Sequence, residues 1–330
     1  VQNDKYPPSF AYLHRLSNCV GGIFFHMYIR NFILLLALFF SQLLFAEDLN
    51  DYKYENYKAS AVEVSFTSIL PKMRAEMYDG KEISGLMYKP DGNGPFEAVV
   101  MLHGAGGIFP YQLDWARQLH DEGYVVLFVD SYCKRKFLCE HDSPDNDPKR
   151  RKAVNRWKDI TPPQRAADAF GAFEYLLQQN FVNKDKISLM GFSWGGTSGL
   201  MAINPMMKKM FYSTKVEFHS LIAFYPNSKY WSRMGRMWGK ISDIKITIPT
   251  LILAGIEDEI ESVEVYKDLQ QLAQKKKFPL EVVLYPDSFR KFDEKREKHS
   301  VTVNNITLTK AYNEKAHEDS IKQVLSFLSK

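Results

Sequence analysis

The sequence predicts an α/β protein with a mostly parallel, doubly wound sheet and helices on both faces. Continuous apolar runs, such as residues 98–102 and 250–254, are typical of strands buried on both faces. They alternate with segments of helical spacing, such as residues 112–122. A Gly-x-Ser-x-Gly motif, residues 191–195, stands between a short apolar run and a helix-compatible segment. This alternation indicates βαβ units and therefore a parallel sheet.

The first half of the chain begins with segments that predict antiparallel strands at one edge of the sheet. Residues 63–70 alternate polar and apolar side chains, and Asp79-Gly80 is a turn signal that predicts a hairpin between residues 73–78 and 83–88. The elements expected next are a buried strand at 98–102, a helix at 112–122 ended by Gly123, and a buried strand at 124–129.

The second half continues the strand and helix alternation. Thr161, two prolines and Gln164 form a capping box that begins a helix, and a polar turn at 183–186 leads to the strand before Ser193. The elements expected after that strand are a helix through 200–202, strands at 219–225, 250–254 and 280–285, and helices at 263–275 and 321–328.

Composition and charge narrow the class of protein. The 330 residues are 45% hydrophobic and 25% charged, which is ordinary for a globular chain. We expect one domain over residues 47–330. The net charge of +4 is spread over mixed basic and acidic residues, so nucleic-acid binding has little support. No Cys and His spacing resembles a zinc site, and no metal or cofactor is expected.

The amino-terminal segment has the parts of a secretory signal peptide. A basic residue, Arg30, precedes the apolar run 32–40, and Ala46 offers a small residue for cleavage. We therefore expect residues 27–46 to be a signal peptide, residues 1–26 to be an upstream extension, and the mature chain to be exported. The alternative is an uncleaved membrane anchor, although the apolar run is shorter than the ~20 residues of a spanning helix.

Export makes the cysteines informative. Cys19 precedes the expected cleavage site, so the mature chain holds Cys133 and Cys139, which lie in one predicted loop. In an oxidising compartment these two residues can form a local disulfide, and the alternative is a pair of free thiols.

The motif at 191–195 predicts a nucleophile elbow with Ser193 as nucleophile. Acyl transfer by a serine also needs a base, a carboxylate that orients the base, and donors for the oxyanion. The backbone N–H of Trp194 is one expected donor, and the glycine-rich loop after the strand at 98–102 supplies the other. The candidate loop residues are Gly104, Ala105 and Gly106. Asp258 is the expected acid, because it follows a later strand.

The chain resembles the dienelactone hydrolase family of the α/β-hydrolase superfamily over about residues 70–330. The matching pieces are Tyr88-Lys-Pro90 with Gly94-Pro95, residues 99–107, Val129-Asp-Ser131 with Arg135, Arg165 with Asp168, residues 191–196, residues 255–258 and residues 285–293. The resemblance implies an α/β-hydrolase fold and an ester or lactone substrate. With serine as the nucleophile, the chain resembles the exported, esterase-like members of the family.

One position departs from the family pattern. The last family motif resembles Y-P-x-x-x-H-x-F, with the histidine as base, but here Arg290 occupies the histidine position. Arginine stays protonated in proteins and cannot take the proton of Ser193. His299, in a polar run expected to be a loop, is the remaining candidate base. His317, expected shortly before the last helix, is interpreted as a surface or capping residue.

These patterns leave two hypotheses for function. In the first, the protein is an exported serine hydrolase that cleaves a small-molecule ester or lactone through an acyl-serine intermediate. In the second, it is a catalytically impaired member that binds a small anionic ligand, since Arg290 is a fixed positive charge. A membrane-anchored protein remains an alternative only if the amino-terminal segment is not cleaved.

Overall fold

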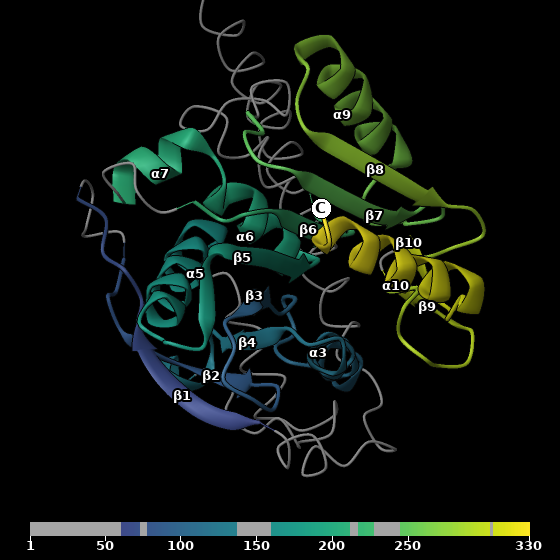
Figure 1. Ribbon diagram of the computed structural model, residues 1–330. Coiled ribbons are helices and arrows are strands. Elements are labelled where there is room, and N and C mark those ends of the chain that lie inside the picture. The colour runs from purple at the N-terminus through teal and green to yellow at the C-terminus, as the bar shows by residue number, and fades with distance from the viewer. Residues whose placement is uncertain (1–60, 73–77, 137–159, 212–216, 228–244, 304–305) are drawn as a thin grey trace, which may run out of the picture.

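A twisted sheet of eight strands forms the centre of the computed structural model (Figure 1). The structure describes residues 61–72, 78–136, 160–211, 217–227, 245–303 and 306–330. The predicted extension, signal peptide and cleavage site within residues 1–46 lie outside these ranges. Within the described ranges, no helix is both long and apolar enough to cross a membrane.

The strand order is β1-β2-β4-β3-β5-β6-β7-β8. The strands are β1 (Val62–Thr67), β2 (Glu82–Tyr88), β3 (Phe96–Leu102), β4 (Val125–Asp130), β5 (Val182–Phe192), β6 (Leu221–Phe224), β7 (Thr250–Gly255) and β8 (Leu280–Tyr285). The strands from β3 to β8 are parallel to their neighbours, and β1 and β2 join antiparallel at one edge. The predicted mostly parallel sheet is therefore confirmed.

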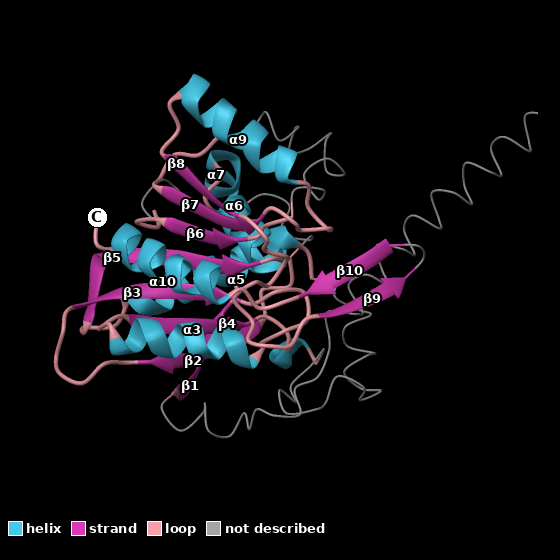
Figure 2. Cartoon of the chain, turned by 90° about the vertical axis from the view of Figure 1, so that its right-hand side faces the viewer, coloured by secondary structure: helices cyan, strands magenta, loops and turns pink. Residues whose placement is uncertain are grey.

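Helices cover both faces of this sheet, as Figures 1 and 2 show. They are α3 (Pro110–Asp121), α5 (Pro162–Leu177), α6 (Trp194–Ala202), α7 (Pro205–Phe211), α9 (Val263–Lys276) and α10 (Glu314–Leu328), with a short 3-10 turn at Cys133–Arg135. α3 and α10 lie on one face, and α5 and α6 lie on the other. The strands β3, β4 and β7 are almost wholly buried between these layers, which explains their continuous apolar sequences.

Local signals explain where α5 begins. The Thr161 hydroxyl accepts from the Gln164 N–H, and the Gln164 side chain accepts from the Thr161 N–H at 2.8 Å. The predicted capping box is therefore present, and it satisfies two N–H groups that the first turn of a helix leaves unpaired.

The predicted hairpin at Asp79-Gly80 is wrong. Both edges of β2 are occupied, by β1 on one side and β4 on the other, so residues 73–78 have no edge of β2 to pair with. Residues 73–77 themselves lie outside the described ranges. The predicted antiparallel edge is confirmed, but β2 pairs there with the earlier strand β1. The connection between these two strands is longer than the tight turn that Asp79-Gly80 suggested.

Two other boundaries differ from the sequence prediction. The segment 183–186, predicted as a turn, belongs to β5, where the pairing with β3 shifts register between Phe96 and Ala98. The extra residues are absorbed as a bulge, which keeps the following residues in register. The last helix begins at Glu314 instead of residue 321, because Asn313 caps it by accepting from the Ala316 N–H.

A two-stranded hairpin of β9 (His299–Val303) and β10 (Ile306–Lys310) was not predicted. In Figure 2 it projects beyond the sheet. Only its first residue, His299, belongs to the polar run 294–299 that was expected to be a loop. The Thr309 N–H donates to Glu259 Oε1 at 2.9 Å, which ties the hairpin to the loop after β7.

Candidate active site

Ser193 lies at a sharp turn between β5 and α6. Its φ is 53°, a left-handed conformation that is rare for a residue with a side chain. The Ser193 N–H donates to the Phe224 carbonyl of β6 at 2.9 Å. Backbone strain of this kind is typical of a nucleophile elbow, which holds the serine hydroxyl out of the sheet.

The glycines beside Ser193 are required by close packing. A Cβ added at Gly195 would lie 2.2 Å from the Leu102 carbonyl oxygen, and one at Gly191 would lie 2.4 Å from the Gly195 backbone. Only glycine fits where β3, β5 and the start of α6 come this close. The Gly-x-Ser-x-Gly motif therefore encodes the shape of the turn.

Arg290 contacts Ser193 directly. Arg290 Nη2 donates to Ser193 Oγ at 2.8 Å and to the Tyr225 carbonyl at 2.8 Å. Arg290 Nη1 donates to Asp258 Oδ2 at 2.7 Å. The guanidinium thus joins the predicted nucleophile to the predicted acid, in the place where the family motif has its histidine.

The charge of Arg290 is held in a buried ion pair. The side chains of Arg290 and Asp258 are 4% and 0% exposed. Burial by itself lowers the pKa of Arg290, but the Asp258 carboxylate, together with Tyr266 and Tyr225, raises it above the usual value. Arg290 therefore stays protonated and can donate hydrogen bonds to Ser193, but it cannot accept the proton of Ser193.

Asp258 is fixed by the turn that follows β7. Its Oδ1 accepts from the N–H groups of Ile260 at 2.9 Å and Glu261 at 3.2 Å, which leaves Oδ2 for Arg290. The neighbouring carboxylates Glu257 and Glu259 are exposed, and Glu259 binds β10 instead. The geometry therefore selects Asp258 from this run of acidic residues.

The glycine-rich loop after β3 lies beside the elbow. A Cβ added at Gly104 would lie 3.7 Å from Ser193 Cβ. Gly104 and Gly107 form an isolated bridge, and the Ala105 carbonyl accepts from the Tyr132 hydroxyl at 2.9 Å. Gly106 packs against the ring of Phe109. The structure thus brings the loop 104–106 close to Ser193, where Trp194 is the first residue of α6.

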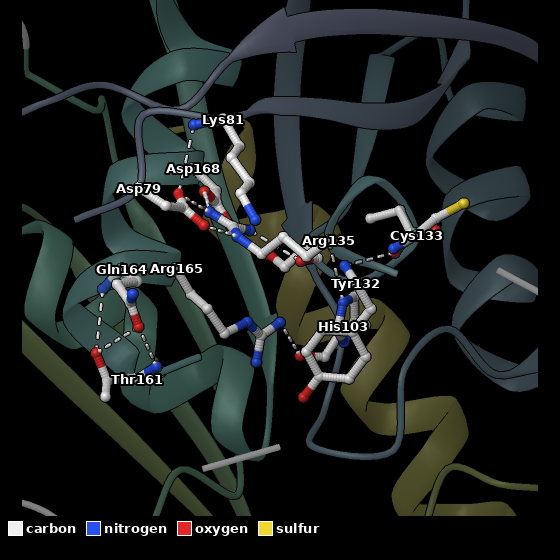
Figure 3. A network of polar contacts seen from close by, with 12 residues as sticks. Asp79, Lys81, His103, Tyr132, Cys133, Arg135, Thr161, Gln164, Arg165 and Asp168 are labelled. Atoms are coloured by element: carbon white, nitrogen blue, oxygen red, sulfur yellow. Dashed lines mark hydrogen bonds and ion pairs between the residues drawn. The ribbon is translucent and has the colours of Figure 1, made fainter. Parts of the chain in front are cut away.

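A network of polar contacts surrounds His103, the residue before this loop (Figure 3). The His103 ring accepts from the Ser131 N–H at 3.3 Å, and the His103 carbonyl accepts from Arg165 Nη2 at 2.5 Å. Arg135 donates to both carboxylate oxygens of Asp168 at 2.8 Å. It also donates to Asp79 at 2.6 and 2.9 Å. Arg165 therefore fixes His103 directly, and Arg135 acts on it only through Ser131, whose carbonyl accepts from Arg135 Nη1 at 2.8 Å.

A second polar cluster near Arg290 was missed from the sequence. Asp293, 2% exposed, accepts from the Tyr225 hydroxyl at 2.9 Å and from Trp115 Nε1 at 3.0 Å. Burial raises the pKa of Asp293 to about 6. The Arg290 guanidinium lies 5.3 Å from the centre of the Tyr225 ring. The sequence signal that could have indicated this cluster is Tyr225, which directly follows strand β6.

Neither remaining histidine is shown to contact Ser193. His299 begins β9 and pairs in register with Lys310, but the placement of its side chain lies outside what the structure describes. His317 lies within α10, not before it as predicted. It contacts the Trp115 ring and the Tyr312 hydroxyl, and burial lowers the pKa of His317 to about 4.

Two other predictions concern cysteines and metals. Cys133 is disulfide-bonded. Its predicted partner, Cys139, lies outside the described ranges. In the part of the chain that the structure describes, no group of three His, Cys, Asp or Glu side chains is arranged to hold a metal ion.

The sheet order, the elbow at Ser193, the carboxylate after β7 and the loop after β3 together define an α/β-hydrolase. Residues 83–330 match the family model described as the dienelactone hydrolase family. The chain belongs to that family and is therefore, by class, a carboxylic ester hydrolase.

Known proteins agree with this assignment. A curated relative named "Putative carboxymethylenebutenolidase", from Saccharolobus solfataricus, is 24% identical in an alignment over 280 residues that covers 76% of this chain and 95% of the relative. Among solved structures, a thermophilic esterase from Thermogutta terrifontis is 15% identical with a TM-score of 0.54, covering 84% of this chain and 97% of the esterase. A dienelactone hydrolase-like phosphotriesterase from metagenomic libraries is 17% identical with a TM-score of 0.54, covering 81% and 98%. These structures share the fold.

Proposed function

We propose that the protein hydrolyses a small carboxylic ester or lactone through an acyl intermediate on Ser193. The observation that carries this proposal is the strained Ser193, with Arg290 Nη2 2.8 Å from its Oγ. A hydrogen bond from a cation stabilises an alkoxide more than a hydroxyl, so Arg290 lowers the cost of ionising Ser193.

The reaction then follows from the positions of these groups. Ser193 Oγ loses its proton to solvent and attacks the acyl carbon, while N–H groups of Trp194 and the loop 104–106 receive the developing oxyanion. The alkoxide of the substrate leaves and the acyl group stays on Ser193 Oγ. A water molecule then attacks the acyl carbon, Ser193 Oγ departs, and the carboxylic acid is released.

The alternative, an impaired protein that binds a small anionic ligand through Arg290, is less favoured by the contacts of the guanidinium. Nη1 donates to Asp258 Oδ2, and Nη2 donates to Ser193 Oγ and to the Tyr225 carbonyl. A separate anion would have to displace one of these contacts, whereas Ser193 Oγ already occupies one of them.

Labelling with a fluorophosphonate probe tests the nucleophile. The Thermogutta terrifontis esterase 2, which shares this fold, has been seen phosphorylated by paraoxon. We expect one phosphonyl group per chain, located on Ser193 by peptide mass spectrometry. Ser193→Ala should abolish the label, and Ser326→Ala, at an exposed serine of α10, should keep it. A folded wild-type chain that stays unlabelled at every pH from 6 to 10 contradicts the proposal.

Export is a separate part of the proposal. The disulfide at Cys133 supports an oxidising compartment, because disulfides rarely persist in the cytosol. We propose that residues 27–46 are removed and that the chain begins at Glu47 after export. Intact mass of the protein recovered from the host that makes it naturally tests this. A chain that retains residues 27–46 and fractionates with membranes would instead support the anchored alternative.

A further inference from the structure

The contacts of Arg290 restrict which esters Ser193 can cleave. In a site with a histidine base, the same imidazole takes the proton of the serine and then gives it to the leaving group. Here Nη1 and Nη2 of Arg290 face Asp258 and Ser193 Oγ. The guanidinium has no lone pair for a proton and does not release one at neutral pH. The position that normally performs both proton transfers therefore performs neither.

This loss changes the fate of the tetrahedral intermediate. Once Ser193 Oγ has attacked, the intermediate can expel either the alcohol part of the substrate or Ser193 itself. Arg290 Nη2 stabilises Ser193 Oγ as an anion, so the serine is a good leaving group. A simple alcohol leaves as an alkoxide, which is a base about as strong as hydroxide and therefore a poor leaving group. Attack on an alkyl ester therefore mostly reverses.

An aryl ester behaves differently. A phenol has a pKa of about 10, so phenolate departs without receiving a proton. Its departure competes well with the return of Ser193 Oγ. Which esters this site cleaves therefore depends on the acidity of the alcohol that leaves. A sufficiently acidic alcohol does not need a proton donor in the protein.

The same contacts slow the second half of the reaction. Departure of Ser193 Oγ from the acyl group is assisted by Arg290, but the attacking water has no base at position 290 to take its proton. General base catalysis contributes about 10²- to 10⁴-fold to such steps. Hydrolysis of the acyl-serine is then slower than its formation from an aryl ester.

We propose that Ser193 accepts acyl groups from esters of acidic alcohols, such as aryl esters, and that the acyl-Ser193 intermediate accumulates because its hydrolysis is rate-limiting. This inference rests on the proposed acyl-serine reaction. Arg290 is the residue that sets the preference, since it stabilises the serine anion and withholds a proton from the leaving group.

Pre-steady-state kinetics with two acetate esters test the inference. The chain over residues 47–330 is mixed with p-nitrophenyl acetate at pH 7.5, and release of p-nitrophenolate is followed by stopped flow. We expect a burst close to one equivalent of active sites, then a steady phase about 100-fold slower or more. Intact mass during the steady phase should show acetylated Ser193. Ethyl acetate, with the same acyl group, should show a kcat/KM about 10²- to 10⁴-fold lower.

Variants separate failure of the inference from failure of the function. R290H supplies an imidazole that can act as both base and acid. It should therefore reduce the burst amplitude and increase the steady-state rate. The ratio of kcat/KM for p-nitrophenyl acetate to that for ethyl acetate should fall by at least about tenfold. R117H, at an exposed arginine of α3, should match the wild type. Phosphonate labelling and circular dichroism of each variant show that the fold and elbow remain.

Each outcome then decides one point. If the wild type turns over both esters at similar kcat/KM without acetyl-Ser193, the inference is wrong although the hydrolase function stands. If that turnover is lost in H299N, the imidazole of His299 is the base and the inference is again wrong. If neither ester ever acylates Ser193 in a folded chain, the proposed function itself fails.

Discussion

Arg290 Nη2 lies 2.8 Å from Ser193 Oγ, while Nη1 of the same guanidinium lies 2.7 Å from Asp258 Oδ2. A side chain that cannot exchange a proton thus connects the proposed nucleophile to a carboxylate. Compared with the histidine of the family pattern, arginine at this position keeps both hydrogen bonds but cannot take a proton. The following predictions depend on that difference.

R290H should change how hydrolysis depends on pH. With imidazole between Asp258 and Ser193, we expect steady-state hydrolysis of p-nitrophenyl acetate to rise about 10- to 100-fold at pH 7.5 and to follow a titration near 6.5. A pH series of kcat/KM measures this. An R290H protein that folds and labels with phosphonate, yet shows no such titration, contradicts the role assigned to position 290.

R290M should destabilise the fold more than a surface change. It leaves the buried Asp258 carboxylate without its cation, which costs about 3–5 kcal/mol in the free energy of unfolding. The double variant R290M/D258N should recover part of this loss, because the amide is neutral and still accepts from the N–H groups of Ile260 and Glu261. Urea unfolding of the two variants gives the comparison. Equal stability of both would show that the ion pair is not the source of the loss.

G195A and G104A form a matched pair at the elbow. The added methyl at residue 195 would lie 2.2 Å from the Leu102 carbonyl, whereas at residue 104 its nearest neighbour is 3.6 Å away. G195A should therefore lose about 3 kcal/mol of stability or more, and G104A should keep the wild-type urea midpoint. If G195A is as stable as G104A, the backbone approach described for the elbow is incorrect.

Asp293 and His317 should have opposite effects on stability across one pH range. Burial raises the pKa of Asp293 from ~3.9 when unfolded to about 6, so the folded chain binds more protons and its stability falls as pH rises through that window. Burial lowers the pKa of His317 from ~6.5 to about 4, so stability rises with pH there. The two contributions largely cancel in the wild type.

Substitution separates these two contributions. D293N should remove the Asp293 contribution and keep that of His317, so the free energy of unfolding should rise with pH between 4 and 6.5 by roughly 2 kcal/mol more than in the wild type. The exposed control D268N should follow the wild type. Urea titrations at a series of pH values make the measurement, and parallel curves for D293N and wild type would contradict the buried titration.

Much of the sheet could be predicted because strands buried on both faces have continuous apolar sequences. The runs that became β3, β4 and β7 carry this signal in consecutive residues. The edge could not be assigned in the same way. A turn signal at Asp79-Gly80 is local, whereas the choice of β1 as partner of β2 is made by pairing across a longer connection.

The site shows the same limit. The placement of Ser193 and Asp258 after strands β5 and β7 was predictable, because each follows a strand in a recognisable local sequence. The contact between Arg290 and Ser193 joins residues 97 positions apart, and the cluster of Asp293 with Trp115 joins residues 178 positions apart. Such contacts depend on how the loops at the carboxyl ends of the strands come together, which no short sequence window records.

The pH dependence of phosphonate labelling at Ser193 tests the central claim most directly. If Arg290 stabilises the Ser193 anion and no imidazole acts as base, the labelling rate of the wild type should rise about tenfold per pH unit from 6 to 9, following hydroxide, without a plateau. A plateau above a titration near 6.5, lost in H299N, would show that a histidine deprotonates Ser193 and would contradict the account.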